Sequence, residues 1–295
     1  MQTDKKRENL TIGVVGLGLI GGSMARAASA LGRHVLGFDK DPAVIEQALL
    51  HGAIEEALSP DQISRCDLLL VALYPQAAVD FLTGCAEKIG PDCLVVDLCG
   101  VKRAVCGPLE RLARRHGFLY LGGHPMAGME KSGFAFSRKD LFQGASMILT
   151  PAEDFPQDKL DWASEFFLSL GFSRMQRSTP EEHDRMIALT SQLAHVISCA
   201  YIGSPAALGF LGFSAGSFQD MTRVARLNET MWTELFLDNA DYLADEIDSM
   251  AQRLTEYGQA VRQGQREKLF DLLRQSRLRK EATDEQKQKA NEVKA

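Results

Sequence analysis

The 295-residue chain lacks the features that mark membrane, secreted and nucleic-acid-binding proteins. Its longest apolar runs, such as residues 68–73, are far too short to span a bilayer. Residues 1–9 are charged and contain no apolar core of a signal peptide, so we expect a cytoplasmic protein with no membrane partner. The formal net charge of -6 leaves no basic surplus for a nucleic-acid partner.

The cysteines show no CxxC pair. Of the six, five lie in the first half of the chain, at Cys66, Cys85, Cys93, Cys99 and Cys106. This pattern is typical of reduced thiols and matches neither a disulfide framework nor a zinc motif. We therefore expect no metal.

The first half alternates short apolar runs with segments of helical length at 21–31 and 42–51. Several runs are continuous in Val, Leu and Ile, as expected of parallel strands that are buried on both faces. The pattern predicts an α/β fold with an N-terminal, doubly wound Rossmann-type sheet, closed by a helix and a strand over 159–177. The other predicted strands are Thr11–Val15, His34–Phe38, 67–73, 93–97, 118–121 and 145–149.

The pattern changes after Ser178. Thr179 as N-cap, Pro180 at the first helical position and Glu182 of the capping box predict a long helix that runs to about residue 202. No strand signal follows. We predict a dinucleotide-binding domain over residues 1–178 and an all-helical substrate and dimerisation domain over 179–295, with a charged, frayed or disordered tail from about 280.

A long apolar stripe begins near Asn228, with residues at three- and four-residue steps. No sheet remains to cover it. Burial against a second copy would cover it and predicts a homodimer. Packing within the same helical domain is the alternative.

A glycine fingerprint follows the first predicted strand and opens the first predicted helix. In such a motif the first glycine makes the turn, the second admits a pyrophosphate and the third lets helix pack on strand. The pyrophosphate then lies at the helix N-terminus, where free N–H groups and the helix dipole favour anions. The candidate cofactor-binding residues are Gly16, Gly18, Leu19, Ile20 and Gly21.

Asp39 ends the second strand, about twenty residues further on. A carboxylate there accepts hydrogen bonds from the adenosine ribose and repels a 2′-phosphate, which predicts NAD rather than NADP. Tyr74 follows the third strand, at the edge where such sheets bind ligands, and is a further candidate for cofactor binding. His124 lies in the loop 122–125 expected at the same edge, where neighbouring glycines and Pro125 give it a rigid mounting. A histidine that only caps a loop is the alternative.

Several longer segments carry a resemblance that covers nearly the whole chain. The segments Gly-His-Pro-Met-Ala-Gly at 123–128 and Asp-Met-Thr-Arg-Val-Ala at 220–225 are specific, and 96–102, 129–133, 182–195 and Trp232 support them. On these residues the chain resembles the prephenate dehydrogenases, a family that includes the arogenate and cyclohexadienyl dehydrogenases.

The resemblance implies NAD-dependent oxidative decarboxylation of prephenate to 4-hydroxyphenylpyruvate in tyrosine biosynthesis, or the corresponding reaction of arogenate. It implies that His124 accepts the proton or hydrogen bond of the ring hydroxyl as hydride leaves. A histidine that must be neutral predicts activity that rises with pH through its pKa, near 6.5 when unperturbed. Arg223 would hold a substrate carboxylate through its fork of N–H donors.

The resemblance also implies site roles for His195, Glu130 and Lys102. His195 would be a second active-site histidine, on one helix face with Ser191 and Asp184, although a hydrogen-bonded histidine at a domain interface explains it almost as well. Glu130 and Lys102 would line the substrate side.

Two departures from the family pattern stand out. Gly100 stands where many members have serine, which removes a hydroxyl beside His124. Gln192 stands where a histidine is often found. Gly216 and Trp232 match positions near the substrate, but Trp232 also fits the apolar stripe and is expected in the core.

Two rival functions remain. A β-hydroxy-acid dehydrogenase would usually carry a lysine on the first long interdomain helix, and residues 181–202 contain none. A non-catalytic NAD sensor would need neither a base at His124 nor an anion clamp at Arg223.

Overall fold

The structure is a computed structural model that describes residues 10–292. The chain packs as two compact units, one up to Leu243 and one from Ala244. We describe each unit by itself. The predicted domain boundary after residue 178 stays a prediction.

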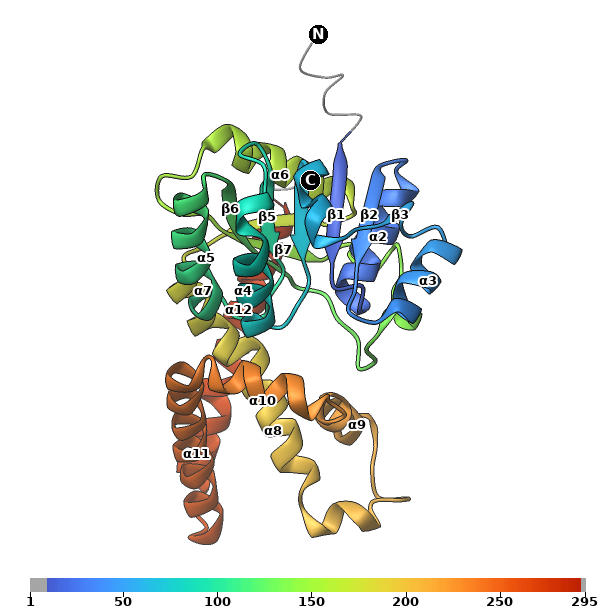
Figure 1. The fold of residues 1–295 in the computed structure, drawn as a ribbon. Coiled ribbons are helices and arrows are strands. Elements are labelled where there is room, and N and C mark those ends of the chain that lie inside the picture. Colours follow the sequence, from blue (N-terminus) through green and yellow to red (C-terminus); the bar gives the residue numbers. More distant parts are fainter. Residues whose placement is uncertain (1–9, 293–295) are drawn as a thin grey trace. The chain divides into compact units, whose positions relative to one another are not determined.

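The first unit is built on one eight-stranded sheet (Figure 1). The strand order is β3-β2-β1-β4-β5-β6-β7-β8, and every neighbouring pair is parallel except β6 and β7. The strands are β1 (Thr11–Val15), β2 (His34–Phe38), β3 (Glu56–Ala57), β4 (Leu68–Val71), β5 (Leu94–Asp97), β6 (Leu119–Pro125), β7 (Ser146–Thr150) and β8 (Arg174–Arg177). The predicted doubly wound α/β fold is confirmed.

Helices cover both faces of this sheet. One hydrophobic cluster joins α2 (Leu19–Ala30), α3 (Pro42–Leu50) and α6 (Gln157–Ser169) to one face. A second cluster joins α4 (Pro75–Cys85) and α5 (Arg103–His116) to the other. Each residue of β4 and β5 is buried, which explains why these strands read as continuous apolar runs.

Strand β6 is longer than predicted. It continues through His124 because β7 pairs with it in the antiparallel direction, with His124 opposite Ile148. His124 therefore lies in a strand and not in a loop. Gly123 does not have a positive φ; a Cβ there would lie 2.8 Å from the backbone oxygen of Asp97, so glycine allows β6 to approach β5.

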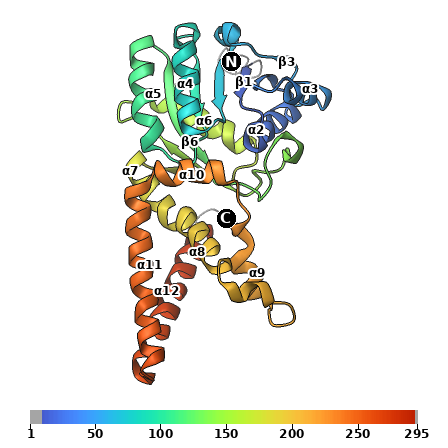
Figure 2. The ribbon, with the colours of Figure 1, turned by 60° about the horizontal axis from the view of Figure 1, so that its bottom comes forward.

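Residues 180–243 contain helices and turns but no strand among those described. Thr179 Oγ1 accepts a hydrogen bond from the Glu182 N–H at 3.2 Å, so the predicted N-cap forms. The expected long helix runs unbroken to residue 202, as α7 (Pro180–Ile187), a π-helical turn (Ala188–Gln192) and α8 (Leu193–Ile202). Helices α9 (Gly216–Thr222) and α10 (Glu229–Leu237) follow, and Figure 2 shows them near α8. Short 3₁₀ turns lie at Pro60–Arg65, Ala86–Lys88, Phe134–Phe136, Pro205–Gly209 and Arg223–Ala225.

The second unit is a helical hairpin. Helix α11 (Ala240–Arg262) begins in the first unit and continues into the second, and α12 (Arg266–Glu292) follows after Gly264. Tyr257 and Ser276 pair through their hydroxyls at 3.1 Å, which links the two helices. The charged segment from about 280 is thus helical as far as 292, and 293–295 lie outside the described residues.

Three further observations concern the part of the chain that the structure describes. No helix there is long and apolar enough to cross a membrane. No group of His, Cys, Asp and Glu side chains there could hold a metal ion. The six cysteines are free, and all except Cys199 are buried.

Candidate active site

The three glycines of the fingerprint each have a distinct environment. Gly16 has φ +83, and a Cβ there would lie 2.5 Å from the backbone oxygen of Ala72. A Cβ on Gly21 would collide with the backbone oxygen of Gly16, so Gly21 allows α2 to pack against the turn. Gly18 has nothing within 4 Å of its Cβ position, so open space lies in front of it. These environments match a turn, a packing contact and an approach path for a pyrophosphate.

The N-terminus of α2 is free to receive an anion. Gly18 is the N-cap, Leu19 and Ile20 are the first helical residues, and no side chain caps this turn. The first N–H groups of a helix have no partner within it, and the helix dipole adds positive potential there. The residues present therefore fit the pyrophosphate of a dinucleotide.

Asp39 lies at the end of β2, beside the glycine turn. Its Oδ2 accepts the Leu17 N–H at 2.8 Å, and its Oδ1 accepts the Asp41 N–H at 3.0 Å. Each carboxylate oxygen can accept a further hydrogen bond, so Asp39 can still accept hydrogen bonds from the hydroxyls of an adenosine ribose. Tyr74, the N-cap residue of α4, is exposed at the same edge of the sheet.

The central feature of the site is a chain of three side chains from β6 and α7. The Nδ1 atom of His124 lies 2.8 Å from the Nε2 atom of His183. The Nδ1 atom of His183 lies 2.7 Å from Oδ1 of Asp184. The side chains of His183 and Asp184 have no exposed surface. No sequence pattern had indicated a role for His183.

The hydrogen bonds from Asp184 through His183 determine the tautomer of His124. The ionised Asp184 only accepts hydrogen bonds, so His183 donates from Nδ1 and its Nε2 is an acceptor. His124 must then donate from Nδ1, which leaves the lone pair on its Nε2. That nitrogen faces Gly100, where a Cβ would lie 3.9 Å from it. His124 is thus set up to accept a proton.

Asp184 is held in place by the start of α5. Its Oδ1 accepts the Lys102 N–H at 2.7 Å, and its Oδ2 accepts the Arg103 N–H at 2.9 Å. Although burial opposes it, hydrogen bonds from His183, Arg103 and Lys102 lower the pKa of Asp184. The carboxylate therefore stays ionised.

His124 and His183 are both kept neutral. Burial, the neighbouring His183 and the charge of Lys102 lower the pKa of His124 well below its usual value. Burial also lowers the pKa of His183, against the opposing effect of Asp184. A neutral imidazole at neutral pH is what a proton acceptor requires.

Lys102 differs from its expected role as a substrate-binding residue. Its side chain has no exposed surface. Its ammonium donates to Oδ1 of Asp97 and to the Gly123 carbonyl, both at 2.5 Å. The charge is therefore used inside the protein and does not face a ligand.

Arg223 and Glu130 form an exposed ion pair. Arg223 Nη1 donates to Glu130 Oε1 at 2.6 Å, and both side chains are exposed. A backbone hydrogen bond and the Arg223 guanidinium lower the pKa of Glu130. The 3₁₀ turn that carries Arg223 packs against α8, which carries His195.

His195 is partly buried and contacts Trp232, with ring centroids 3.8 Å apart. Its Nδ1 lies 2.9 Å from the Ser191 carbonyl oxygen. Burial lowers its pKa. A π-helical turn lies between Asp184 and His195 and adds a residue to the helix, so the regular α-helical spacing that predicted a shared face does not apply to them.

Helix α10 lies beside both His195 and His124. Trp232 contacts His195, and Leu235, one turn later on the same helix, lies near Gly100 and the Nε2 atom of His124. Gln192 secures the helix by donating to the Leu235 carbonyl at 2.7 Å. Trp232 is therefore a partly buried residue beside the site, not the core residue that the apolar stripe suggested. Gly216 is exposed at the start of α9.

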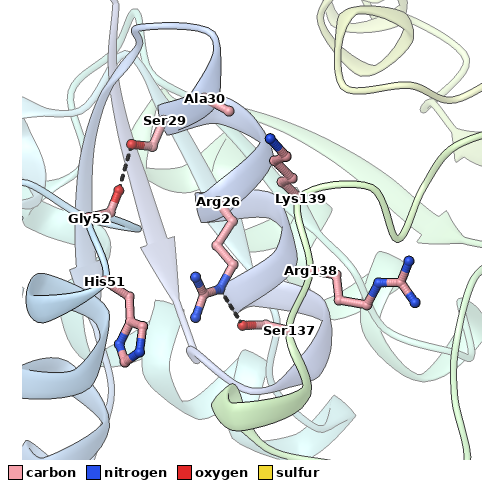
Figure 3. Close-up of a pocket in the computed structure, with 8 residues that line it drawn as sticks. All are labelled: Arg26, Ser29, Ala30, His51, Gly52, Ser137, Arg138 and Lys139. Carbon is pink, nitrogen blue, oxygen red and sulfur yellow. Dashed lines mark hydrogen bonds between the residues drawn. The ribbon is translucent and has the colours of Figure 1, made fainter.

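A separate cavity of about 280 Å³ lies along α2 (Figure 3). In it Arg26 donates to Ser137 at 2.8 Å, and Ser29 donates to the Gly52 carbonyl at 2.7 Å. None of the predicted site residues lines it. Its lining residues are Arg26, Ser29, Ala30, His51, Gly52, Ser137, Arg138 and Lys139.

Two family models match the chain. The model described as prephenate dehydrogenase, nucleotide-binding domain, matches residues 24–174, and that described as prephenate dehydrogenase, dimerization domain, matches residues 179–275. Together they support a dehydrogenase with a dinucleotide cofactor. The first match begins after the glycine fingerprint, so the fingerprint geometry is independent support.

Curated relatives and solved structures agree with the models. A cyclohexadienyl dehydrogenase of Zymomonas mobilis is 30% identical over 260 residues, which are 85% of this chain and 88% of the relative. A prephenate dehydrogenase of Bacillus subtilis is 27% identical over 88% of this chain and 72% of the relative. The structure of Synechocystis arogenate dehydrogenase is 26% identical, with a TM-score of 0.79 over 93% of this chain and 100% of that one. The chain belongs to the prephenate dehydrogenase family.

Proposed function

We propose that this protein catalyses the NAD-dependent oxidative decarboxylation of prephenate to 4-hydroxyphenylpyruvate. The observation that carries the proposal is the Asp184–His183–His124 chain, which leaves the lone pair of His124 Nε2 directed toward Gly100. A base at this position suits a substrate that loses hydride from a carbon bearing a hydroxyl. The two relatives and the arogenate dehydrogenase structure compared above act, by their names, on substrates of this kind.

In this reaction NAD supplies the hydride acceptor. His124 Nε2 accepts the hydroxyl proton as hydride leaves the ring carbon. The C–OH group thereby becomes a C=O group. Loss of carbon dioxide returns an electron pair to the ring, makes it aromatic and leaves a phenolate. His124 then returns its proton to that oxygen, so the protein ends the cycle unchanged.

His183 and Asp184 stabilise the protonated form of His124 during the step. The imidazolium donates from Nδ1 to His183, which in turn donates to the ionised carboxylate of Asp184. The positive charge is therefore opposed by a fixed negative charge two hydrogen bonds away. Because all three groups are in place before substrate arrives, little reorganisation is needed.

Arg223 is the proposed partner of a substrate carboxylate. Its guanidinium is exposed and presents several N–H donors, of which the structure pairs Nη1 with Glu130. A planar fork of donors matches a carboxylate better than an ammonium does. Glu130 then keeps Arg223 oriented until the dianionic substrate binds, and His195 with Trp232 forms an adjoining wall.

Five residues of the glycine turn and Asp39 are the proposed cofactor contacts. The N-terminus of α2 at Gly18, Leu19 and Ile20 would hold the pyrophosphate. Asp39 would accept hydrogen bonds from the adenosine ribose and disfavour a 2′-phosphate, which is why we propose NAD. Tyr74 would border the cofactor at the start of α4.

We also propose that the protein works as a homodimer. The helical half matches a dimerization domain. Leu208, Leu211 and Phe213, between α8 and α9, are 92%, 78% and 92% exposed in the single chain. Large apolar side chains this exposed are typical of surfaces that bind a partner.

An assay of reduced cofactor formation tests the proposal, with prephenate and arogenate each offered with NAD and with NADP. We expect turnover with prephenate and NAD. Turnover with arogenate alone would replace the substrate and keep the chemistry, since the two compounds differ only at the side chain remote from the reacting hydroxyl. No turnover with either compound would overturn the proposed function and favour the β-hydroxy-acid alternative.

A further inference from the structure

A lysine without exposed surface lies directly behind the base. Lys102 Nζ donates to Asp97 Oδ1 at 2.5 Å and to the Gly123 carbonyl at 2.5 Å. Asp97 also has no exposed side-chain surface, and its Oδ2 accepts the Tyr120 hydroxyl at 2.7 Å. The lysine and its partners form a closed network with no access to solvent.

Lys102 contacts both ends of the Asp184–His183–His124 chain. The Gly123 carbonyl belongs to the peptide bond that joins Gly123 to His124, so the ammonium holds the backbone of the base itself. The backbone N–H of Lys102 donates to Asp184, the far end of the same chain. One residue thus sets the separation between His124 and the carboxylate that supports it.

Buried ionisable groups lie close to His124. His183 from α7 and Lys102 from the loop after β5 act on it, and each is paired with a buried carboxylate, Asp184 and Asp97 respectively. Helix α10 contributes the apolar Leu235 on the remaining side. The ammonium of Lys102 lowers the pKa of His124, and its own partner is the carboxylate of Asp97, which has no exposed side-chain surface.

Stability alone is a poor reason for such a pair. A buried ion pair costs desolvation free energy that its mutual attraction rarely exceeds, and apolar replacements of similar volume are often neutral or stabilising. Although burial opposes it, Asp97 keeps the pKa of Lys102 above its usual value, so the lysine remains charged. A charged lysine held at the peptide of the base is better explained by what it does to His124.

We propose that Lys102 is a positioning residue: its buried ammonium fixes the Gly123–His124 peptide and offsets the charge of Asp97 behind the imidazole pair. This inference rests on the proposed function, in which His124 is the base. It replaces direct substrate contact as the role of Lys102. Asp97 and Tyr120 complete the support, since they hold the ammonium in place.

Two variants separate charge balance from positioning. Lys102→Met leaves Asp97 unopposed, so we expect the pKa of His124 to rise by about one unit or more and kcat to fall about 100-fold. The double variant Asp97→Asn with Lys102→Met removes both charges, so the pKa of His124 should rise less than in Lys102→Met. Its kcat should still fall, because the Gly123 carbonyl has lost its donor. Lys88→Met, which removes an exposed lysine paired with Asp61, is the matched control.

The measurements are kcat and KM against pH, together with an NMR titration of the His124 ring in the protein without ligand. A wild-type kcat in the double variant overturns the proposal, as does an unchanged His124 pKa in Lys102→Met. If Lys102→Met does not fold, the double variant alone decides through its kcat. If the wild-type protein turns over neither prephenate nor arogenate, the proposed function fails. The NMR titration without ligand then still tests the effect of Lys102 on His124.

Discussion

His124 and His183 come from different halves of the chain, yet their rings are joined by a 2.8 Å contact between Nδ1 and Nε2. The contact links the end of strand β6 to the first turns of α7. It explains how a histidine on the sheet is held in one tautomer by a carboxylate that it does not touch. The proposed chemistry depends on this contact.

Replacing Asp184 by Asn should disturb the tautomer of the whole chain. The amide can donate to His183 Nδ1, so His183 would donate from Nε2 and His124 would carry its proton on Nε2. We expect kcat to fall by up to about 10⁴-fold, the loss that an Asp-to-Asn change of the same kind causes in a Ser-His-Asp triad. Steady-state kinetics checks this, with thermal unfolding as a control because Asp184 also accepts two backbone N–H groups of α5. A folded variant with wild-type kcat would contradict the claim that Asp184 sets the tautomer of His124 through His183.

The pH dependence should have its acidic limb below 6.5. The pKa of His124 is lowered by burial, His183 and Lys102, so kcat/KM should already be at its plateau at pH 7 and should decline only in more acidic solution. An inflection above 6.5 that His124→Asn abolishes would contradict the described environment.

The same histidines should make folding stability depend on pH. The pKa values of His124 and His183 are lower in the folded state than in the unfolded state, so the unfolded chain binds more protons as the pH falls. Stability from these groups is fully present above about pH 6.5 and is lost below it. Chemical denaturation of the wild type and of His183→Gln across pH 5–8 measures this, and the variant should lose less stability on acidification. An equal loss in both proteins would rule out His183 as a contributor.

Two glycine-to-alanine changes should have different effects. The Cβ position of Gly18 meets nothing within 4 Å, so Gly18→Ala should fold normally and bind NAD at least about tenfold more weakly, because the methyl group obstructs the pyrophosphate. The Cβ of Gly21 would collide with the Gly16 carbonyl, so Gly21→Ala should lower the melting temperature. Calorimetric titration with NAD and thermal melts separate the two. Unimpaired NAD binding by Gly18→Ala would remove the pyrophosphate from this turn.

Replacing Arg223 by Ala should chiefly weaken substrate binding. A charge-assisted hydrogen bond contributes about 1.5–3 kcal/mol, so KM for prephenate should rise about 10–100-fold with a smaller change in kcat. Stability should change little, because the pair with Glu130 is exposed and such pairs contribute little. Arg223→Lys should restore only part of the affinity. An unchanged KM would mean that the carboxylate binds elsewhere.

The sequence predicted the fold well because its signals are local. Continuous apolar runs mark β4 and β5, and Thr179 marks the start of α7. The length of β6 was missed, since its last residues are strand only through pairing with β7. The π-helical turn was missed as well, and it invalidates the helical spacing that placed Asp184 beside His195.

The site was predicted less completely, for a different reason. The fingerprint and His124 lie in motifs that can be recognised along the chain, whereas the partnership with His183 is a tertiary contact between residues 59 positions apart. The pair His183-Asp184 in the resembling segment was the available signal. Lys102 was expected beside the substrate because the family resemblance implied it; lysine is rarely buried without a partner, and only the tertiary contacts with Asp97 and Gly123 show why this one is.

The most direct test of the account is the turnover of His124→Asn, measured beside the dissociation constant of prephenate for the same variant. Asparagine keeps a polar side chain of moderate size but cannot accept a proton at neutral pH. We predict that kcat falls by about 10²–10⁴-fold, as for the loss of a general base, while the dissociation constant changes less than about threefold. A variant that retains wild-type kcat would contradict the central claim that His124, held by His183 and Asp184, is the base of this enzyme.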